Sequence, residues 1–267
     1  MSDASLALFG AAYARHRQAE GRDYSGDELA ALPYVHSGPL ARQWAVRART
    51  FDAFMRYVLR PERTRSGQRL TVLDLGAGNG WLSYRVGREG ERAIALDIRT
   101  DAIDGLGAAE TLADRLGSRM RCVNGSFQSI PLLSDQADIA VFNASLHYAT
   151  DLKSALGEAV RVVRTGGCVA ILDSPFYATE SDGLAMVSEK HAKAATRFGD
   201  AADVLLGPPF IEFLTPARLA SASRELGLQW QRRRVSYPLW YELRPLLARL
   251  TGRRQPSRFD LWVARVP

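Results

Sequence analysis

Residues 71–80 read Thr-Val-Leu-Asp-Leu-Gly-Ala-Gly-Asn-Gly, a short apolar run that breaks into three glycines at alternate positions. The continuation, residues 81–86, has helical spacing, so the segment predicts a buried strand, a tight turn and the start of a helix. Glycines let a backbone pass close to a ligand, where any Cβ would block it. A dinucleotide-binding turn has glycine at its first, third and sixth places, but the sixth place here is Trp81. The turn therefore predicts a nucleotide-like ligand other than a dinucleotide.

Strand-like and helical stretches alternate along the chain from residue 70 onward. Short apolar runs indicate strands, and apolar side chains at helical spacing between them indicate helices. The strand-like runs lie at 70–75, 93–97, 120–123, 138–143, 167–172, 228–235 and 259–266. The helical stretches lie at 80–88, 101–116, 151–164, 216–226 and 241–250. This alternation predicts an α/β fold whose parallel sheet is covered by helices on both faces.

Two regions lie outside this alternation. Residues 40–60 have apolar side chains at helical spacing, and Pro61 is expected to end this helix. Together with the turn-rich residues before it, this helix predicts an N-terminal helical cap over residues 1–60. Residues 175–212, after the fifth strand, predict an insertion within a domain that spans residues 61–267.

The composition limits the function further. The formal net charge is +6, and nearly all basic residues are arginines spread along the chain, apart from the cluster Arg232–Arg234. A nucleic-acid-binding face would combine clustered basic residues with exposed aromatic residues, so nucleic acid is not the expected partner. No apolar run approaches the ~18–20 residues of a membrane span, and no basic segment precedes the apolar patch at the N-terminus. We therefore expect no secretion signal, no membrane span and a cytoplasmic location.

The two cysteines, Cys122 and Cys168, each lie at the end of a predicted strand. No CxxC pair or His/Cys cluster with metal-ligand spacing accompanies them in the sequence. We therefore expect two buried thiols and no metal site.

Polar residues follow four of the predicted strands at the point where each strand ends. The glycine turn follows the first, Asp97 closes the second, and Asn124–Phe127 and Asn143–Tyr148 follow the third and fourth. Carboxyl ends of parallel strands meet at one edge of a doubly wound sheet, where such folds bind ligands. Asp97 lies about 20 residues after the turn, where an acidic side chain accepts hydrogen bonds from ribose hydroxyls. The sequence therefore predicts a nucleotide site at this edge of the sheet.

These motifs together resemble those of class I S-adenosylmethionine-dependent methyltransferases of the small-molecule type. Residues 74–80 are similar to the DLGxGxG turn of that family, and Asp97 matches its acidic residue after strand two. Residues 138–143 match the strand-four motif, and residues 162–167 match the L(K/R)PGG segment, with Thr165 in place of proline.

The resemblance covers residues 70–175 strongly and 215–266 weakly. It implies a Rossmann-like fold, with a doubly wound, mostly parallel seven-stranded sheet whose last strand is antiparallel. It also implies the cofactor S-adenosyl-L-methionine, which leaves as S-adenosyl-L-homocysteine after methyl transfer. Asp97 would accept hydrogen bonds from both ribose hydroxyls, Ile98 would pack on the adenine, and Asp74 would orient the turn or reach the tail amine. The residues expected to bind the cofactor are Asp74, Gly76, Ala77, Gly78, Asp97, Ile98, Ser126, Phe127 and Asn143.

The resemblance further implies methyl transfer to an oxygen, nitrogen or carbon atom of a small organic molecule. Much of the acceleration can come from holding donor and acceptor in line, and a base is needed only where the acceptor loses a proton. His147 after strand four is the expected base because imidazole titrates near neutrality, and Tyr148 is the second catalytic candidate. Residues 1–60 and 175–212 are expected to cover the acceptor pocket. The side chains expected in its lining are Tyr34, His36, Phe176, Tyr177, Phe198 and Phe210.

Three other functions stay open. A DNA or RNA amino-methyltransferase has an Asn/Asp-Pro-Pro-Tyr/Phe motif directly after strand four, whereas the similar run Asp173–Tyr177 follows strand five. A nicotinamide oxidoreductase is disfavoured by Trp81 at the sixth place of the turn, where a core position is expected instead. A non-catalytic S-adenosylmethionine-binding partner or regulatory subunit would keep the motifs without turnover. The sequence names neither the methyl acceptor nor the oligomeric state.

Overall fold

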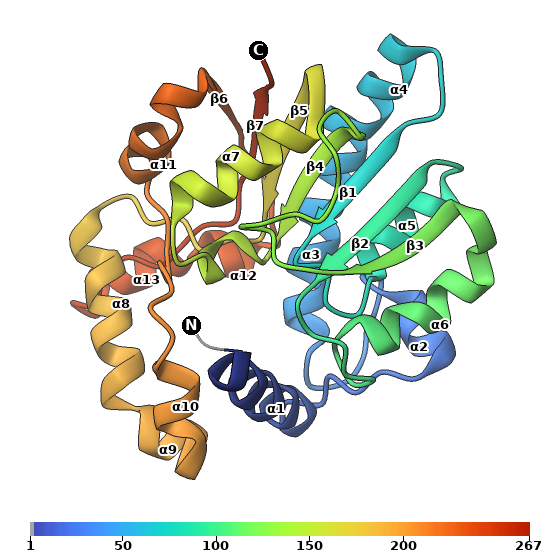
Figure 1. Cartoon of the computed structure of the whole chain (residues 1–267). Coiled ribbons are helices and arrows are strands. Elements are labelled where there is room, and N and C mark those ends of the chain that lie inside the picture. Colours follow the sequence, from blue (N-terminus) through green and yellow to red (C-terminus); the bar gives the residue numbers. More distant parts are fainter. Residues whose placement is uncertain (1–2) are drawn as a thin grey trace.

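The computed structural model describes residues 3–267, and its centre is a seven-stranded sheet in the order β3-β2-β1-β4-β5-β7-β6 (Figure 1). The strands are β1 (Thr71–Leu75), β2 (Arg92–Asp97), β3 (Met120–Asn124), β4 (Ala137–Asn143), β5 (Val163–Leu172), β6 (Trp230–Arg233) and β7 (Leu261–Arg265). Strands β1 to β5 pair in parallel, and β7 is antiparallel to both of its neighbours. The predicted fold class is therefore confirmed. The strand order reverses between β1 and β4, and the crevice at such a switch point is where open α/β sheets bind ligands.

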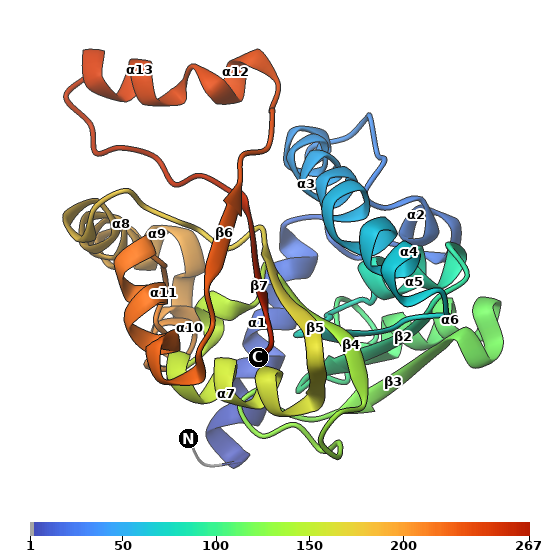
Figure 2. The ribbon, with the colours of Figure 1, turned by 90° about the horizontal axis from the view of Figure 1, so that it is seen from above.

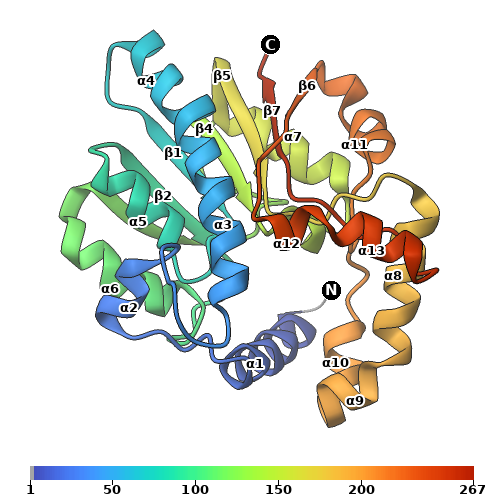
Figure 3. The ribbon, with the colours of Figure 1, turned by 180° about the vertical axis from the view of Figure 1, so that it is seen from behind.

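Helices cover both faces of the sheet. α3, α5 and α6 pack on the face turned to the viewer in Figure 3, whereas α7 and α11 pack on the opposite face. Successive residues of a strand point to opposite faces of the sheet. Val72 therefore packs against the first group of helices and Leu73 against the second. The helices on these faces are α3 (Ala41–Phe54), α4 (Arg60–Ser66), α5 (Trp81–Arg88), α6 (Leu106–Leu116), α7 (Leu152–Val162) and α11 (Pro216–Ser223).

The remaining helices lie before, between and after these elements. They are α1 (Asp3–Ala19), α2 (Gly26–Ala31), α8 (Glu180–Ala192), α9 (Ala194–Phe198), α10 (Ala202–Leu206), α12 (Leu239–Glu242) and α13 (Arg244–Leu250). Single 3₁₀ turns occupy Gly117–Arg119, Leu146–Tyr148, Gly199–Ala201 and Arg224–Leu226. Among residues 3–267, every helix is too short or too polar to cross a bilayer.

The helix expected to end at Pro61 continues to Ser66. A π-helical turn, Met55–Leu59, precedes the proline, and the Arg60 amide bonds back to the carbonyl of Met55. A widened turn of this kind re-spaces the carbonyls that a proline ring would otherwise strike in a regular α-helix. The helix instead ends at Gly67, whose left-handed φ of 64° makes it a C-cap. The division of the chain at residue 60 stays a prediction.

The helix expected from residue 101 begins only at Leu106. Asp101 folds the preceding chain into a turn, because its Oδ1 accepts hydrogen bonds from the amides of Ile103 (3.1 Å) and Asp104 (2.9 Å). Residues 98–105 therefore form a loop after β2, and this loop carries Asp104 to the edge of the sheet where the glycine turn lies.

Candidate functional site

A cavity of about 360 Å³ opens at the carboxyl ends of β1, β2 and β4, beneath α1 and α3. Its floor includes most of the residues predicted to bind a cofactor. These are Gly76, Ala77, Gly78, Asp97, Ile98, Ser126, Phe127 and Asn143, together with the catalytic candidate Tyr148. Its roof comes from the N-terminal helices and their connections, through Phe9, Tyr13, Arg17, Arg22, Trp44 and Arg47. Two predicted site residues, Asp74 and His147, lie outside the cavity wall.

The glycine turn is held against β2. The amides of Gly76 and Ala77 both donate to the carbonyl of Leu96, at 2.8 and 2.9 Å. Gly76 has a φ of +74°, and a Cβ built on it would lie 2.5 Å from the Cβ of Ser145. Only glycine combines that backbone angle with that close approach. The turn therefore passes next to the end of β4 and leaves its upper side open to the cavity.

Asp97 is the buried carboxylate of the cavity floor. Its Oδ2 accepts from the Gly78 amide and its Oδ1 from the Arg99 amide, both at 2.8 Å. Burial raises the pKa of Asp97, and the Arg99 charge and these two amides act in the opposite sense. Each oxygen can accept one further hydrogen bond, so the carboxylate is positioned to receive two donors from a ligand.

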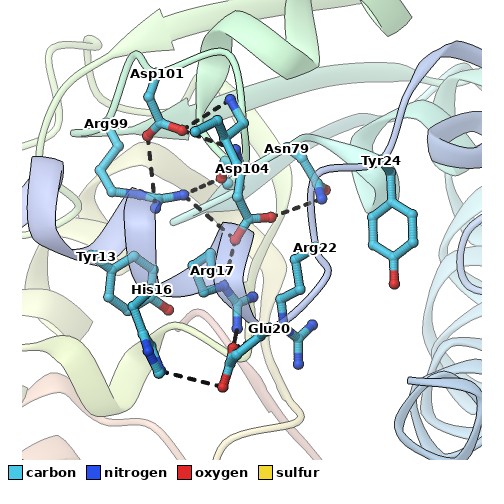
Figure 4. Close-up of polar contacts among 12 residues, drawn as sticks. Tyr13, His16, Arg17, Glu20, Arg22, Tyr24, Asn79, Arg99, Asp101 and Asp104 are labelled. Carbon is cyan, nitrogen blue, oxygen red and sulfur yellow. Dashed lines mark hydrogen bonds and ion pairs between the residues drawn. The ribbon is translucent and has the colours of Figure 1, made fainter. Parts of the chain in front are cut away.

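Asp104 joins the roof to the glycine turn, a role that the sequence did not predict (Figure 4). Its Oδ1 accepts from the side-chain amide of Asn79 (2.9 Å), and its Oδ2 accepts from Nε of Arg17 on α1 (2.6 Å). Arg99 adds a longer ion pair at 3.7 Å. The one available signal was the pair Asp104-Gly105, which interrupts the helical pattern.

Four arginines line the cavity, three from the roof and Arg99 from the loop after β2, and they differ in their partners. Arg17 pairs with Asp104, Arg22 with Glu20 (3.3 Å), and Arg99 with Asp104. Arg47 has no hydrogen bond or ion pair with any side chain that the structure describes, and its guanidinium lies over the ring of Trp44 at 5.2 Å. A guanidinium in this position would be stabilised by an anionic group of a bound ligand.

Aromatic side chains close one end of the cavity. Tyr13 on α1 meets Tyr148 edge to face, with centroids 5.9 Å apart and hydroxyls 3.0 Å apart. Phe210, predicted to line the pocket, packs on Tyr148 (5.4 Å) and on Phe9 (5.3 Å). The insertion therefore contributes one aromatic ring to this wall.

The other side chains expected in the pocket lie elsewhere. Phe176 stacks on Trp262 at 4.7 Å, and Tyr177 packs against Phe213. Phe198 packs against His16 in a neighbouring crevice between α1 and α9. Tyr34 and His36 lie outside the cavity wall, and the Tyr34 hydroxyl donates to Asp52 (2.7 Å).

Polar atoms without partners gather where β4 and β5 end. Among described residues, Oδ1 of Asn143, Nδ1 of His147 and both carboxylate oxygens of Asp173 lack a hydrogen-bond partner. Burial, assisted by Arg47, Lys190 and Arg17, lowers the pKa of His147 to about 3. Burial raises the pKa of Asp173 to about 6. Since buried polar groups are normally hydrogen-bonded, this end of the sheet is suited to a ligand or water that supplies donors.

Asp74 lies beneath the glycine turn, on the side of the sheet that faces α5. Its Oδ2 accepts from the hydroxyl of Ser83 (3.0 Å), while Oδ1 has no partner among described residues. Burial raises the pKa of Asp74 to about 7, against the opposing hydrogen bond from Ser83. The carboxyl therefore anchors the strand to the helix after the turn.

We expect Asp74 to make folding stability depend on pH. Its folded-state pKa is about 7 against an ordinary value of 3.8, so the folded chain holds a proton that the unfolded chain releases between these values. The stabilisation is complete below pH about 4 and is lost as the pH rises to about 7, with a slope of up to ~1.4 kcal/mol per pH unit. Urea unfolding at several pH values should show this fall, and Asp74→Asn should flatten it.

The pKa of Asp173 is also raised, to about 6, so Asp173 likewise makes stability fall as the pH rises to about 6. Asp74→Asn should therefore differ from the parent most clearly between pH about 6 and 7, where Asp74 alone of the two still titrates. Equal slopes in that interval for parent and Asp74→Asn would contradict the assignment.

Comparison with known proteins adds the following similarities. A family profile described as a methyltransferase domain matches residues 73–171. The malonyl-[acyl-carrier protein] O-methyltransferase of Pectobacterium atrosepticum is 31% identical over 114 residues, 43% of this chain and 40% of that protein. The ubiquinone/menaquinone biosynthesis C-methyltransferase of Dinoroseobacter shibae is 30% identical over 139 residues, 51% of this chain and 50% of that protein. The chain thus spans half or less of the length of these relatives.

Solved structures resemble the whole fold at low sequence identity. The geranyl diphosphate C-methyltransferase of Streptomyces coelicolor, crystallised with Mg²⁺, geranyl diphosphate and S-adenosyl-L-homocysteine, has a TM-score of 0.60 and 13% identity, covering 89% of this chain and 88% of that one. A putative sarcosine dimethylglycine methyltransferase of Galdieria sulphuraria has a TM-score of 0.57 and 18% identity, covering 82% and 85%.

Proposed function

We propose that this chain, whose residues 73–171 match a methyltransferase-domain profile, is a class I S-adenosylmethionine-dependent methyltransferase that methylates an oxygen, nitrogen or carbon atom of a small organic molecule. The observation that carries the proposal is the cavity floor, where the glycine turn and the Asp97 carboxylate face one space. The family's cofactor supplies a methyl group on a sulfonium, which is open to in-line displacement.

The residues of the floor fit that cofactor. Gly76 lets the backbone of the turn pack directly against Ser145 and line the cavity, and Asp97 keeps one free acceptor site on each oxygen for the ribose hydroxyls. Ile98, which is 38% exposed, offers an apolar surface to the adenine from the position after Asp97. Phe127 and Ser126 border the same space.

Arg47 is the proposed partner of the cofactor's carboxylate. It is the roof arginine without an anionic partner among described residues, and Trp44 holds it over the cavity. The tail of S-adenosylmethionine carries a carboxylate, which a guanidinium can bind through two parallel hydrogen bonds.

We expect Arg47→Gln to weaken binding of S-adenosylhomocysteine by about 10- to 100-fold, because a hydrogen bond to a charged group contributes ~1.5–3 kcal/mol. Isothermal titration calorimetry measures the change. Arg49→Gln, an exposed arginine on the same helix, is the matched control and should leave the affinity within about 3-fold of the parent. An unchanged affinity in Arg47→Gln would remove Arg47 from the cofactor site.

The chain's contribution to the reaction is then mainly positioning. In this proposal the floor and Arg47 fix the donor, α1 and the aromatic wall exclude water, and the space between Asn143 and the aromatic wall receives the acceptor. Holding two reactants in line can supply several kcal/mol of the acceleration, roughly 7–11 in favourable cases. If the acceptor loses a proton, the proposed base is Nδ1 of His147, which has no described partner; because His147 lies behind the cavity wall, it would take the proton through an intervening water molecule.

We expect His147→Ala to lower turnover by ~10²–10⁴ if His147 acts as the base, with the affinity for S-adenosylhomocysteine nearly unchanged. Because its pKa is lowered to about 3, the imidazole is neutral throughout the physiological range, so the rate should show no titration near pH 6.5. Steady-state rates at several pH values measure both effects. An undiminished rate would assign the acceleration to positioning alone.

The small-molecule acceptor is supported by the named relatives. Their names give a malonyl group on a carrier protein, ubiquinone and menaquinone biosynthesis, and geranyl diphosphate as the context of methylation. A nucleic-acid methyltransferase and a regulatory subunit remain the alternatives, and turnover on a small acceptor separates both from the proposal.

Calorimetry tests the proposal as a whole. The chain should bind S-adenosylhomocysteine, and NAD should not compete with it. Binding of NAD without binding of S-adenosylhomocysteine would overturn the proposal. Tight binding without turnover on any acceptor would favour a regulatory subunit instead.

A further inference from the structure

α12 and α13 form an arm that stands away from the rest of the molecule (Figure 2). The arm, residues 239–250, exposes large apolar side chains to solvent. These are Leu239 (73% exposed), Trp240 (39%), Leu243 (41%), Leu246 (52%), Leu247 (55%) and Leu250 (74%). Contiguous apolar exposure of this kind marks an interaction surface, because single scattered apolar residues need no explanation but a gathered set does.

The exposed leucines follow one helical stripe. Leu239, Leu243, Leu246 and Leu250 are spaced by four, three and four residues, which places them on the same side of a helix. Leu243 between the two helices keeps helical backbone angles (φ −79°, ψ −12°). The opposite side is already used, since Tyr241 and Ala248 are buried. The stripe is therefore an apolar face that no residue in the described part of the chain covers.

The charge around the stripe is of one sign. Residues 234–254 contain five arginines and a single acidic residue, Glu242. Glu242 is already paired with Arg258 (2.8 Å) and lies 3.6 Å from Arg234. From the body, Arg42 on α3 extends over the ring of Trp240 at 5.7 Å. Arg254 pairs with Glu189 on α8 (3.0 Å) and Arg244 lies over the ring of Tyr241 (3.8 Å), so Arg249 and Arg253 are the arginines of residues 234–254 without an anionic or aromatic partner among the described residues. A second copy of the chain docked symmetrically on the stripe would bring these two arginines close to their own counterparts.

We propose that the arm docks on an anionic lipid bilayer, with the leucine stripe and Trp240 in the interface and Arg249 and Arg253 against the headgroups. Interfacial helices combine these features: an apolar face with leucine and tryptophan, and basic residues beside it. Each arginine near an anionic surface contributes about 1 kcal/mol. The inference goes beyond the proposed function, because it concerns where the chain is held and applies whether or not it transfers a methyl group.

Co-sedimentation with vesicles tests the proposal on the full chain. Vesicles of phosphatidylcholine mixed with phosphatidylglycerol should pellet the protein, and vesicles of phosphatidylcholine alone should pellet much less. Leu243→Glu combined with Leu246→Glu, both in the stripe, should lower the partition coefficient more than 10-fold, since each substitution places a carboxylate where an apolar side chain would be buried. Arg249→Gln and Arg253→Gln should each lower it by about 5-fold.

Matched controls separate docking from unfolding. Leu133→Glu changes a leucine that is 78% exposed on another part of the surface, and it should leave the partition coefficient unchanged. All variants should keep the circular dichroism spectrum of the parent. Trp240→Phe should keep docking but remove most of the blue shift of tryptophan fluorescence that anionic vesicles induce in the parent.

Two results would overturn the proposal. One is failure of the parent protein to pellet with phosphatidylglycerol vesicles at low salt. The other is a dimer in sedimentation velocity that Leu243→Glu abolishes while vesicle binding is unaffected, which would identify a second copy as the occupant. Failure of the parent protein to bind S-adenosylhomocysteine would contradict the proposed function but not the docking of the arm.

Discussion

Replacing Asp97 by alanine should weaken binding of S-adenosylhomocysteine by about 10²-fold or more. Two ribose hydroxyls would lose a charged acceptor, and each such hydrogen bond contributes ~1.5–3 kcal/mol. The substitution also leaves the amides of Gly78 and Arg99 without the acceptor that they have in the parent. The loss should therefore exceed that of any single roof residue, and calorimetry measures it directly.

The controls for Asp97 distinguish its charge from its shape. Asp97→Asn preserves the shape but replaces one acceptor by a donor, so it should retain only part of the affinity. Asp114→Ala removes an exposed carboxylate from α6 and should leave the affinity intact. Since burial raises the pKa of Asp97, the parent's affinity should fall as the pH drops toward that value. Equal affinities in parent and Asp97→Ala would refute a ribose-binding carboxylate.

Replacing Gly76 by alanine should have the second large effect, a loss of about 2–5 kcal/mol in the free energy of unfolding. Part of this comes from the left-handed φ of +74°, and part from the new Cβ, which would lie 2.5 Å from Cβ of Ser145. Ser145 cannot easily move, because its hydroxyl bonds the carbonyl of Leu75 at the end of β1. The cavity floor should be displaced as a result, so binding of S-adenosylhomocysteine should fall with the stability.

Gly67→Ala isolates the contribution of the backbone angle. Gly67 has a φ of +64°, and a Cβ there would meet nothing within 4 Å. Its substitution should cost only the strain, about 1–2 kcal/mol, without loss of ligand binding. Chemical unfolding of the two variants gives the comparison. A Gly76→Ala protein no less stable than Gly67→Ala would show that the turn tolerates a side chain.

The strands of this fold were predictable because they are buried on both faces. Runs such as 70–75 and 93–97 are mostly apolar, and the structure places β1 at Thr71–Leu75 and β2 at Arg92–Asp97. The last strands were less clear, since the pattern at 228–235 indicated a longer element than Trp230–Arg233. β6 lies at the edge of the sheet and is mostly exposed, so burial constrains its composition weakly.

The floor of the site was predictable for a geometric reason. Turns after parallel strands converge on one edge of the sheet, so the sequence positions of Gly76, Asp97 and Asn143 fix their neighbourhood. Asp74 was less predictable, since it shares the strand face of Val72 and so points toward α5. His147 lies beside Tyr148 in a 3₁₀ turn, where successive side chains diverge by about 120°, and Tyr148 takes the cavity side.

The roof could not be predicted from local patterns. Helical spacing shows that residues 41–54 have an apolar face, but it does not show that Trp44 and Arg47 overhang the glycine turn. The same holds for Tyr13 and Arg17 on α1, whose place depends on contacts made more than 80 residues away. Such contacts depend on tertiary packing, which a single sequence does not display.

The residues that line the cavity come from two parts of the chain. The floor lies inside the stretch shared with the methyltransferase domain family, while Phe9, Arg17, Trp44, Arg47 and Phe210 lie outside it. In engineering terms the part contributed by the insertion can be varied separately. Residues 198–213, which bring Phe210 to the wall, can be diversified as a library while the floor, Arg17 and Arg47 stay constant, so selection for a new acceptor leaves the proposed donor site unchanged.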